Sequence, residues 1–201
     1  DFVAKGSEFK ETVAGLTRQA ADQGDANFAS QPFAGATVGE HVTAMAGRLG
    51  ENIGLGRVVR FEATGGLVDG YKHVQNERGT IGVLVELTGV DPADAKAVEV
   101  AHDIALHIAS AAPRWVRRED VPVEVVESER QVLENLTRNE GKPEAAIPKI
   151  VEGRIGGFYK DNVLLEQGFV RDPKTTVGSL LAALGSGATV LRMVRVKVGE
   201  D

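Results

Sequence analysis

The sequence predicts an α+β protein of two related subdomains, in which helices pack on small antiparallel sheets and an antiparallel helical hairpin is inserted. Three observations lead to this class. Apolar residues at helical spacing alternate with short β-branched stretches, one three-residue word recurs in both halves, and two apolar stripes flank a Gly-Pro break near residue 142. With 201 residues, the chain is long enough to bury a hydrophobic core without disulfides.

The first half of the chain is expected to hold three helices and three strands. Apolar residues spaced three and four apart predict the helices, which lie at residues 5–22, 37–49 and 92–112. Asp91 is placed to cap the last of these helices, and Pro113 to end it. Alternating, β-branched stretches predict the strands, at residues 57–63, 67–74 and 80–88. Residues 25–36 are rich in small and polar types and are expected to form a loop.

The second half begins with the predicted helical hairpin, at about residues 123–161. Its two narrow apolar stripes lie on either side of Gly141-Lys142-Pro143, which is a sharp break in any helix. The pattern then returns to mixed structure, with a strand at 163–170, a helix at 176–184 and a strand at 189–198.

A repeat links the two halves. Thr37-Val38-Gly39 opens a predicted helix that leads to Arg57-Val58-Val59-Arg60, and Thr176-Val177-Gly178 opens another that leads to Arg192-Met193-Val194-Arg195. The gaps between the two words differ by about one helical turn. We therefore expect two related core subdomains, at residues 1–115 and 116–201, with the hairpin inserted into the second.

Composition narrows the functions open to the chain. Lys and Arg number 23 and Asp and Glu 29, and the resulting net charge of −6 argues against nucleic-acid and anionic-membrane partners. The absence of cysteine excludes disulfides, thiolate metal sites and a cysteine nucleophile, and it fits a cytoplasmic location. The longest apolar runs, such as residues 81–85, are far shorter than a membrane-spanning helix requires.

The sequence contains no recognisable catalytic motif. The glycines of residues 47–56 lack the Lys-Ser/Thr of a phosphate-binding loop, so they are interpreted as a helix end and turn, and an enzyme site there is the less favoured alternative. His102 and His107 are five residues apart, which aligns them poorly for a shared metal ion. We expect no bond chemistry, no cofactor and no metal, and therefore recognition of a partner rather than an enzyme.

Short words along the whole chain carry a resemblance to a known family. Asp1-Phe2-Val3-Ala4-Lys5 resembles the Thr-Asp-Phe-Val-Ala-Lys/Arg signature of the bacterial elongation factor Ts family, without its threonine. Further words follow in the family's order: Leu49-Gly50-Glu51-Asn52, Ile81–Val85, His107-Ile108-Ala109, Glu119–Pro122, Gly141-Lys142-Pro143, Val151–Arg154, Leu165-Glu166-Gln167, Lys174–Gly178 and Val198-Gly199-Glu200. Each word is weak alone, but their number and order make the resemblance specific.

The resemblance implies a guanine nucleotide exchange factor for elongation factor Tu, the GTPase of translation elongation. Such a factor meets the GDP-bound and the nucleotide-free GTPase and promotes GDP release by disturbing the Mg²⁺ and phosphate-loop region. The implied contacts are Asp1, Phe2 and Val3 at the Mg²⁺ and nucleotide side, with Phe2 as a wedge; Leu49 and Gly50 against a GTPase helix; His73 beside the phosphate loop; and Phe169, Val170 and Arg171 against a second GTPase domain.

The resemblance also implies that the hairpin is a coiled-coil arm. The family's amino-terminal helical domain has no counterpart in these residues, so we expect the chain to be the core and arm of a longer protein of roughly 270 residues. The alternative interpretation is a dimeric scaffold that joins partners through the hairpin and has no exchange activity. A homodimer is compatible with both interpretations, and the rate of GDP release from the GTPase distinguishes them.

Overall fold

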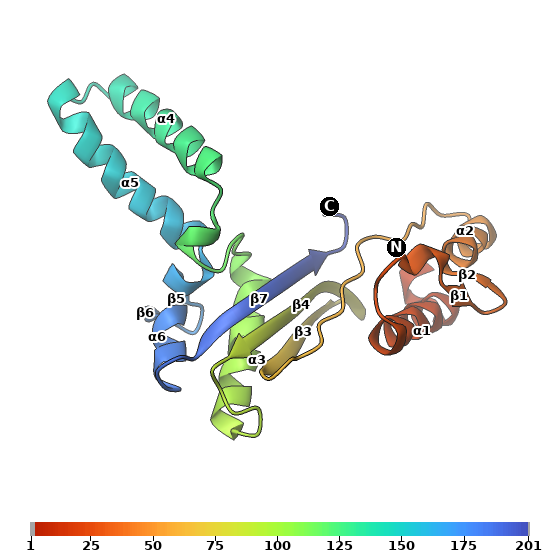
Figure 1. Ribbon diagram of the computed structural model, residues 1–201. Coiled ribbons are helices and arrows are strands. Elements are labelled where there is room, and N and C mark those ends of the chain that lie inside the picture. Colours follow the sequence, from red (N-terminus) through yellow and green to blue (C-terminus); the bar gives the residue numbers. More distant parts are fainter. Residues whose placement is uncertain (1–2, 201) are drawn as a thin grey trace. The chain divides into compact units, whose positions relative to one another are not determined.

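The computed structural model, drawn in Figure 1, describes residues 3–200. The chain divides into two compact units. Unit 1 comprises the residues up to Glu62, residues 72–82 and the residues from Val196 onward. Unit 2 comprises residues 63–71 and 83–195. The structure mixes helices with small sheets, in agreement with the predicted α+β class.

Unit 1 is built on two helices and a minimal sheet. In chain order its elements are the 3-10 helix η1 (Val3–Lys5), α1 (Ser7–Gln23), the 3-10 helix η2 (Phe28–Ser30), β1 (Pro32–Phe33), β2 (Ala36–Thr37) and α2 (Val38–Leu49). The core of these elements contains Ala20 of α1, Phe28, and Val38 and Val42 of α2. Thr37 and Glu40 form a reciprocal capping box, which explains why α2 begins where the sequence predicts.

The main sheet has three strands in the order β3-β4-β7, with bounds Leu67–Gln75, Arg78–Thr88 and Thr189–Lys197. Asn76 and Glu77 connect β3 to β4, and their φ angles of 50° and 64° give the left-handed pair typical of a tight hairpin turn. On β4, alternate apolar residues are buried, namely Val83, Val85 and Leu87. This alternation is the pattern that predicts the strand.

Unit 2 contains the long helix α3 (Ala95–Ala111), whose apolar face is buried. After it come η3 (Arg118–Asp120), α4 (Val123–Asn139), η4 (Glu144–Ala146), α5 (Ile147–Asn162), η5 (Leu164–Glu166), β5 (Gly168–Phe169), β6 (Asp172–Thr176) and α6 (Val177–Ala182). Asp94 caps α3 through a bond to the Lys96 amide, so α3 begins three residues later than the Asp91-Pro92 pair predicts. Pro at position 92 instead belongs to the preceding turn.

The helical hairpin at 123–161 consists of α4 and α5, which lie side by side (Figure 1). Ile147, Val151 and Ile155 are buried on one face of α5 and pack with Leu133 of α4. Thr137 of α4 is also buried, and its hydroxyl oxygen accepts a 3.1 Å hydrogen bond from Arg154. Gly156 and Gly157 do not interrupt α5, because the packed seam outweighs their low helix propensity.

Two predicted strands are wrong. Residues 57–63 have no regular secondary structure, although they alternate as a strand would. Val58 packs against the helical core of unit 1, so the alternation reflects packing on helices rather than on a sheet. Residues 163–170 form η5 and then the two-residue strand β5. The predicted loop at 25–36 likewise contains η2 and β1.

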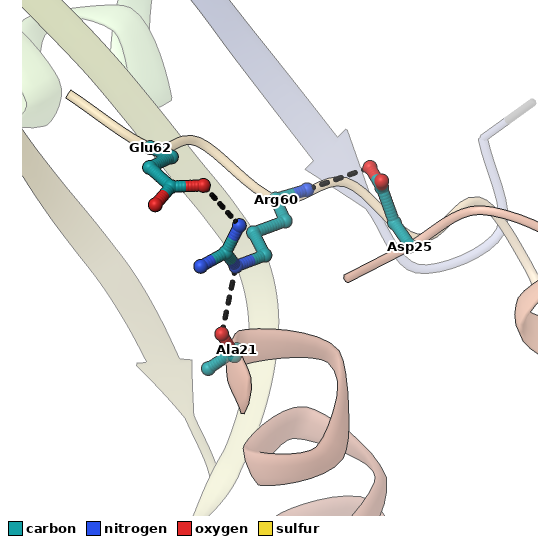
Figure 2. Close-up of polar contacts among 4 residues, drawn as sticks. All are labelled: Ala21, Asp25, Arg60 and Glu62. Carbon is teal, nitrogen blue, oxygen red and sulfur yellow. Dashed lines mark hydrogen bonds and ion pairs between the residues drawn. The ribbon is translucent and has the colours of Figure 1, made fainter. Parts of the chain in front are cut away.

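Arg60 fastens the irregular segment to the end of α1 (Figure 2). Its Nε donates to the Ala21 carbonyl at 2.7 Å, and its backbone N–H donates to the Asp25 carboxylate at 2.8 Å. Glu62 completes the contact by accepting from Nη1 at 2.7 Å. In a strand, the Arg60 backbone N–H would donate to a neighbouring strand. Here it donates to the Asp25 side chain instead.

We expect Arg60→Ala to lower the free energy of unfolding by about 1 kcal/mol, because the Ala21 carbonyl loses a charged donor. Arg57→Ala is the matched control, since Arg57 belongs to the same sequence word and is exposed. Urea unfolding of the two variants measures the difference. Equal losses in both variants would contradict the structural role of Arg60.

Candidate functional site

The predicted contact residues of unit 1 come from three separate segments. Val3 is half-buried in η1, Leu49 ends α2, and His73 is exposed on β3. Asp1 and Phe2 lie outside the described residues.

One backbone hydrogen bond and two ion pairs connect these three segments to the start of α1. The Val3 carbonyl accepts from the Gly6 amide at 2.9 Å, and α1 begins at the next residue. Glu8 of α1 pairs with Arg48, the neighbour of Leu49. Lys10 of α1 lies 3.9 Å from Glu77, in the hairpin turn that follows the strand of His73. The start of α1 therefore contacts, directly or through Gly6, a residue in or next to each of these three segments.

Gly50 ends α2 in a left-handed conformation, with φ 67° and ψ 24°. Its amide donates to the Ala46 carbonyl at 2.9 Å, which is the usual way to close a helix at glycine. A Cβ atom built on Gly50 would meet nothing within 4 Å. The requirement for glycine therefore comes from the backbone, and the exposed peptide remains open to a close approach.

The predicted contact residues of unit 2 lie on the β5–β6 turn and divide by burial. Phe169 is only 5% exposed and lies beside the His107 ring, with ring centroids 6.0 Å apart. Val170 is 41% exposed, and the Arg171 side chain is 55% exposed. Val170 and Arg171 therefore present the surface of this turn, while Phe169 supports it from inside.

Helix α3 holds this turn through two side chains on one face. The His107 ring accepts from the Val170 amide at Nδ1, 3.2 Å, and lies 2.9 Å from Gln167 Oε1 through Nε2. One turn earlier, Asp103 pairs with Arg171 at 2.5 Å. His107 is 1% exposed, and this burial lowers its pKa below the usual value, because the charged ring would lose its hydration.

The sequence predicts the contact residues but not what supports them. Glu8, Lys10 and Glu77 carry no motif, and His107 is singled out only as one of two poorly spaced histidines and as the first residue of the word His107-Ile108-Ala109. A usable signal is present nonetheless: Gln31-Pro32-Phe33 before Thr37-Val38-Gly39 is matched by Gln167-Gly168-Phe169 before Thr176-Val177-Gly178. This longer match extends the repeat to the glutamines that bind the preceding helices.

The glycines of residues 47–56 do not form a close-fitting loop. A Cβ atom built on Gly47, Gly54 or Gly56 would meet nothing within 4 Å. Within residues 3–200, no group of three or more His, Asp or Glu side chains is arranged to hold a metal ion. In the same part of the chain, no helix is both long and apolar enough to cross a membrane.

The predicted contacts in both units thus include exposed residues, among them His73, Val170 and Arg171. Comparison with known proteins gives the family of this chain. The family described as Elongation factor TS matches residues 1–200. Elongation factor Ts of Streptomyces griseus is 46% identical over 205 residues, covering 99% of this chain and 70% of that protein.

Two further relatives agree. Elongation factor Ts of Micrococcus luteus is 42% identical over 206 residues, covering 100% of this chain and 71% of that protein. Elongation factor Ts of Thermobifida fusca is 41% identical over 206 residues, covering 100% of this chain and 70% of that protein. The chain belongs to the elongation factor Ts family, a family of translation elongation factors.

We expect Gly50→Ala to lower the free energy of unfolding by about 1–2 kcal/mol, because alanine is strained at φ 67°. Gly47→Ala, in the interior of α2 and equally free of neighbours, should raise it by about 0.5–1 kcal/mol. Chemical denaturation measures both. Effects of the same sign would show that the left-handed conformation of Gly50 is not retained in solution.

Stability should also fall in acid because of His107. A lowered pKa in the folded state means that the unfolded chain binds more protons below its own pKa, about 6.5. The stability that the protein gains from keeping His107 neutral is fully present above that pH. It is lost progressively as the pH falls below it. Unfolding free energies between about pH 7.5 and 5.5 should therefore decrease more for the wild type than for His107→Gln. Parallel profiles would exclude a buried neutral His107.

Proposed function

We propose that this chain is a guanine nucleotide exchange factor for elongation factor Tu and promotes GDP release by disturbing the Mg²⁺ and phosphate-loop region. Membership of the elongation factor Ts family is the main support. The contacts around the start of α1 support the proposal further. They connect Val3, the end of α2 and the turn that follows the strand of His73 to the same helix start, so the proposed contact residues of unit 1 are linked to one element.

The proposed action makes no bond and works by linkage. An exchange factor binds the nucleotide-free GTPase more tightly than the GDP-bound form. It therefore lowers the affinity of the GTPase for GDP by the same ratio by which GDP lowers the affinity for the factor. GDP is bound largely through Mg²⁺ and the phosphate loop. Mg²⁺ requires near-ideal octahedral coordination, so a small displacement of its ligands weakens GDP binding. In this proposal Phe2 is the wedge, Asp1 acts on the Mg²⁺ side, and Val3 connects both to η1.

The remaining contacts have distinct roles in the proposal. Leu49 and the open peptide of Gly50 approach a GTPase helix, and exposed His73 lies beside the phosphate loop. Val170 and Arg171 contact a second GTPase domain, and Phe169 contributes from within by supporting their turn.

We also propose that the two units contain copies of one repeat. In each copy a glutamine carbonyl accepts the first amide of the helix that Thr-Val-Gly opens: Gln31 from Val38 at 2.9 Å and Gln167 from Val177 at 3.0 Å. The second arginine of each Arg-x-x-Arg word donates to the last turn of the helix that comes before the glutamine: Arg60 to Ala21 of α1 and Arg195 to Ala109 of α3.

The repeat gives the helical hairpin its place. Residues 24–27 connect α1 to η2, whereas residues 112–163, which include α4 and α5, connect α3 to η5. The hairpin is thus an insertion in the second copy, and we propose that it serves as a coiled-coil interaction arm. The subdomain division at residue 115 stays a prediction, and the contacts of α3 with the β5–β6 turn favour a boundary before α3.

We expect Phe2→Ala to reduce the stimulated rate of GDP release at least tenfold, since interface aromatics carry a large share of binding energy, about 2 kcal/mol or more each. Stopped-flow fluorescence with labelled GDP on elongation factor Tu measures the rate. Val198→Ala is the matched control, because Val198 is also apolar, is 78% exposed and has no proposed contact.

Two outcomes would change the proposal. An unchanged rate for Phe2→Ala would reject the wedge while leaving exchange intact. No acceleration by the wild-type chain at substoichiometric amounts would reject exchange itself and favour the dimeric scaffold. Sedimentation of the chain alone then tests the scaffold, since Val132 and Leu136 on α4 are 57% and 48% exposed.

A further inference from the structure

We propose that His107 is a positioning residue, which holds the β5–β6 turn in the conformation that presents Val170 and Arg171 to the GTPase. This inference rests on the proposed function, in which those two residues contact a second GTPase domain. His107 itself is buried, with 1% of its surface exposed. It acts through hydrogen bonds at both ring nitrogens.

The contacts allow one assignment of the ring proton. The Val170 amide can only donate, so Nδ1 of His107 must accept and carries no proton. Nε2 then carries the proton and donates to Gln167 Oε1 at 2.9 Å. The Gln167 amide is oriented in turn by its own donation to the Asp161 carbonyl at 2.8 Å. The resulting chain of donors and acceptors requires a neutral ring in a single tautomer.

This chain of bonds controls the part of the turn that faces outward. The β5–β6 pairing is irregular between Gly168 and Phe169, so the ladder alone does not fix the residues that follow. The Val170 side chain is exposed while its amide points inward to His107. A ring that no longer accepts would free the amide, and the exposed side chain would lose its fixed direction.

The charged groups around His107 do not replace it. Asp103, one turn earlier on α3, is already paired with Arg171, and Asp161 contributes its backbone carbonyl to Gln167. Gln167, which follows η5, and Phe169 of β5 also contact the ring, and both are uncharged. Protonation of the ring would place a donor against the donor of Val170, so acid should loosen the turn.

The first repeat shows which residue can substitute for the histidine. Gln19 lies one turn before the end of α1, as His107 does in α3, and its Nε2 donates to Gln31 Oε1 at 3.0 Å. Gln31 is the counterpart of Gln167 in the repeat. A glutamine at position 107 carries both a donor and an acceptor, so it can keep both bonds, whereas leucine keeps neither.

The first test uses the free chain and needs no GTPase. Nitrogen-15 NMR of the imidazole should show an unprotonated Nδ1 and a protonated Nε2 at neutral pH. The Val170 amide should be protected from hydrogen exchange in the wild type and in His107→Gln, and should lose about threefold to tenfold of that protection in His107→Leu. The opposite tautomer, or equal protection in all three chains, would overturn the proposal.

The second test measures GDP release from elongation factor Tu over a range of concentrations of each chain. His107→Leu should raise the half-saturating concentration about threefold to tenfold and leave the saturating rate near wild type, because the proposed wedge is elsewhere. His107→Gln should restore the wild-type concentration dependence. Urea unfolding checks that each variant is folded. An equal rise of the half-saturating concentration in His107→Leu and His107→Gln would overturn the positioning role.

The outcomes separate this inference from the proposed function. Val170→Asp tests the contact itself: an unchanged half-saturating concentration would remove Val170 from the interface and, with it, the positioning role. If the wild-type chain does not accelerate GDP release, exchange fails as the function, and protection of the Val170 amide in the three chains alone decides whether His107 holds the turn.

Discussion

Each two-stranded sheet of this protein depends on one glutamine side chain. Strand pairs as short as β1-β2 and β5-β6 have too few ladder bonds to persist alone. Gln31 and Gln167 tie them to the preceding helices through their side-chain amides and accept the first amide of the following helix at their carbonyls. One residue beside each small sheet thus connects the helix before the sheet to the helix after it.

Much of the fold follows from apolar periodicity. The helices near 5–22 and 37–49 and the hairpin at 123–161 were predictable because each buries one face, and a single buried face leaves a period in the sequence. The segment at 57–63 shows the limit of this reasoning. Its alternation indicates one buried side, but the surface that covers that side consists of helices, and Asp25 takes the amide of Arg60. A local pattern does not reveal its partner.

The candidate site divides in the same way. Gly50 could be predicted, because a glycine after an apolar helical run indicates a left-handed helix end. The pairs of Glu8 with Arg48 and of Lys10 with Glu77 could not, since they join residues distant in sequence and involve surface charges of common type. The sequence marks His107 as a poor metal ligand and as part of a family word, but not as a support for this turn, because its partners, Gln167 and the Val170 amide, lie beyond the hairpin.

The division of the contact residues between two units has a kinetic consequence under the proposed function. Once the contact residues of one unit are bound, those of the other meet their target at an effective concentration that the connecting chain determines. Two contacts of modest affinity therefore give a high overall affinity. The same arrangement allows departure in two steps. An incoming nucleotide that displaces the set at the phosphate loop leaves only the second contact, and a modest contact dissociates quickly. A bivalent factor can therefore hold the empty GTPase tightly and still be released rapidly.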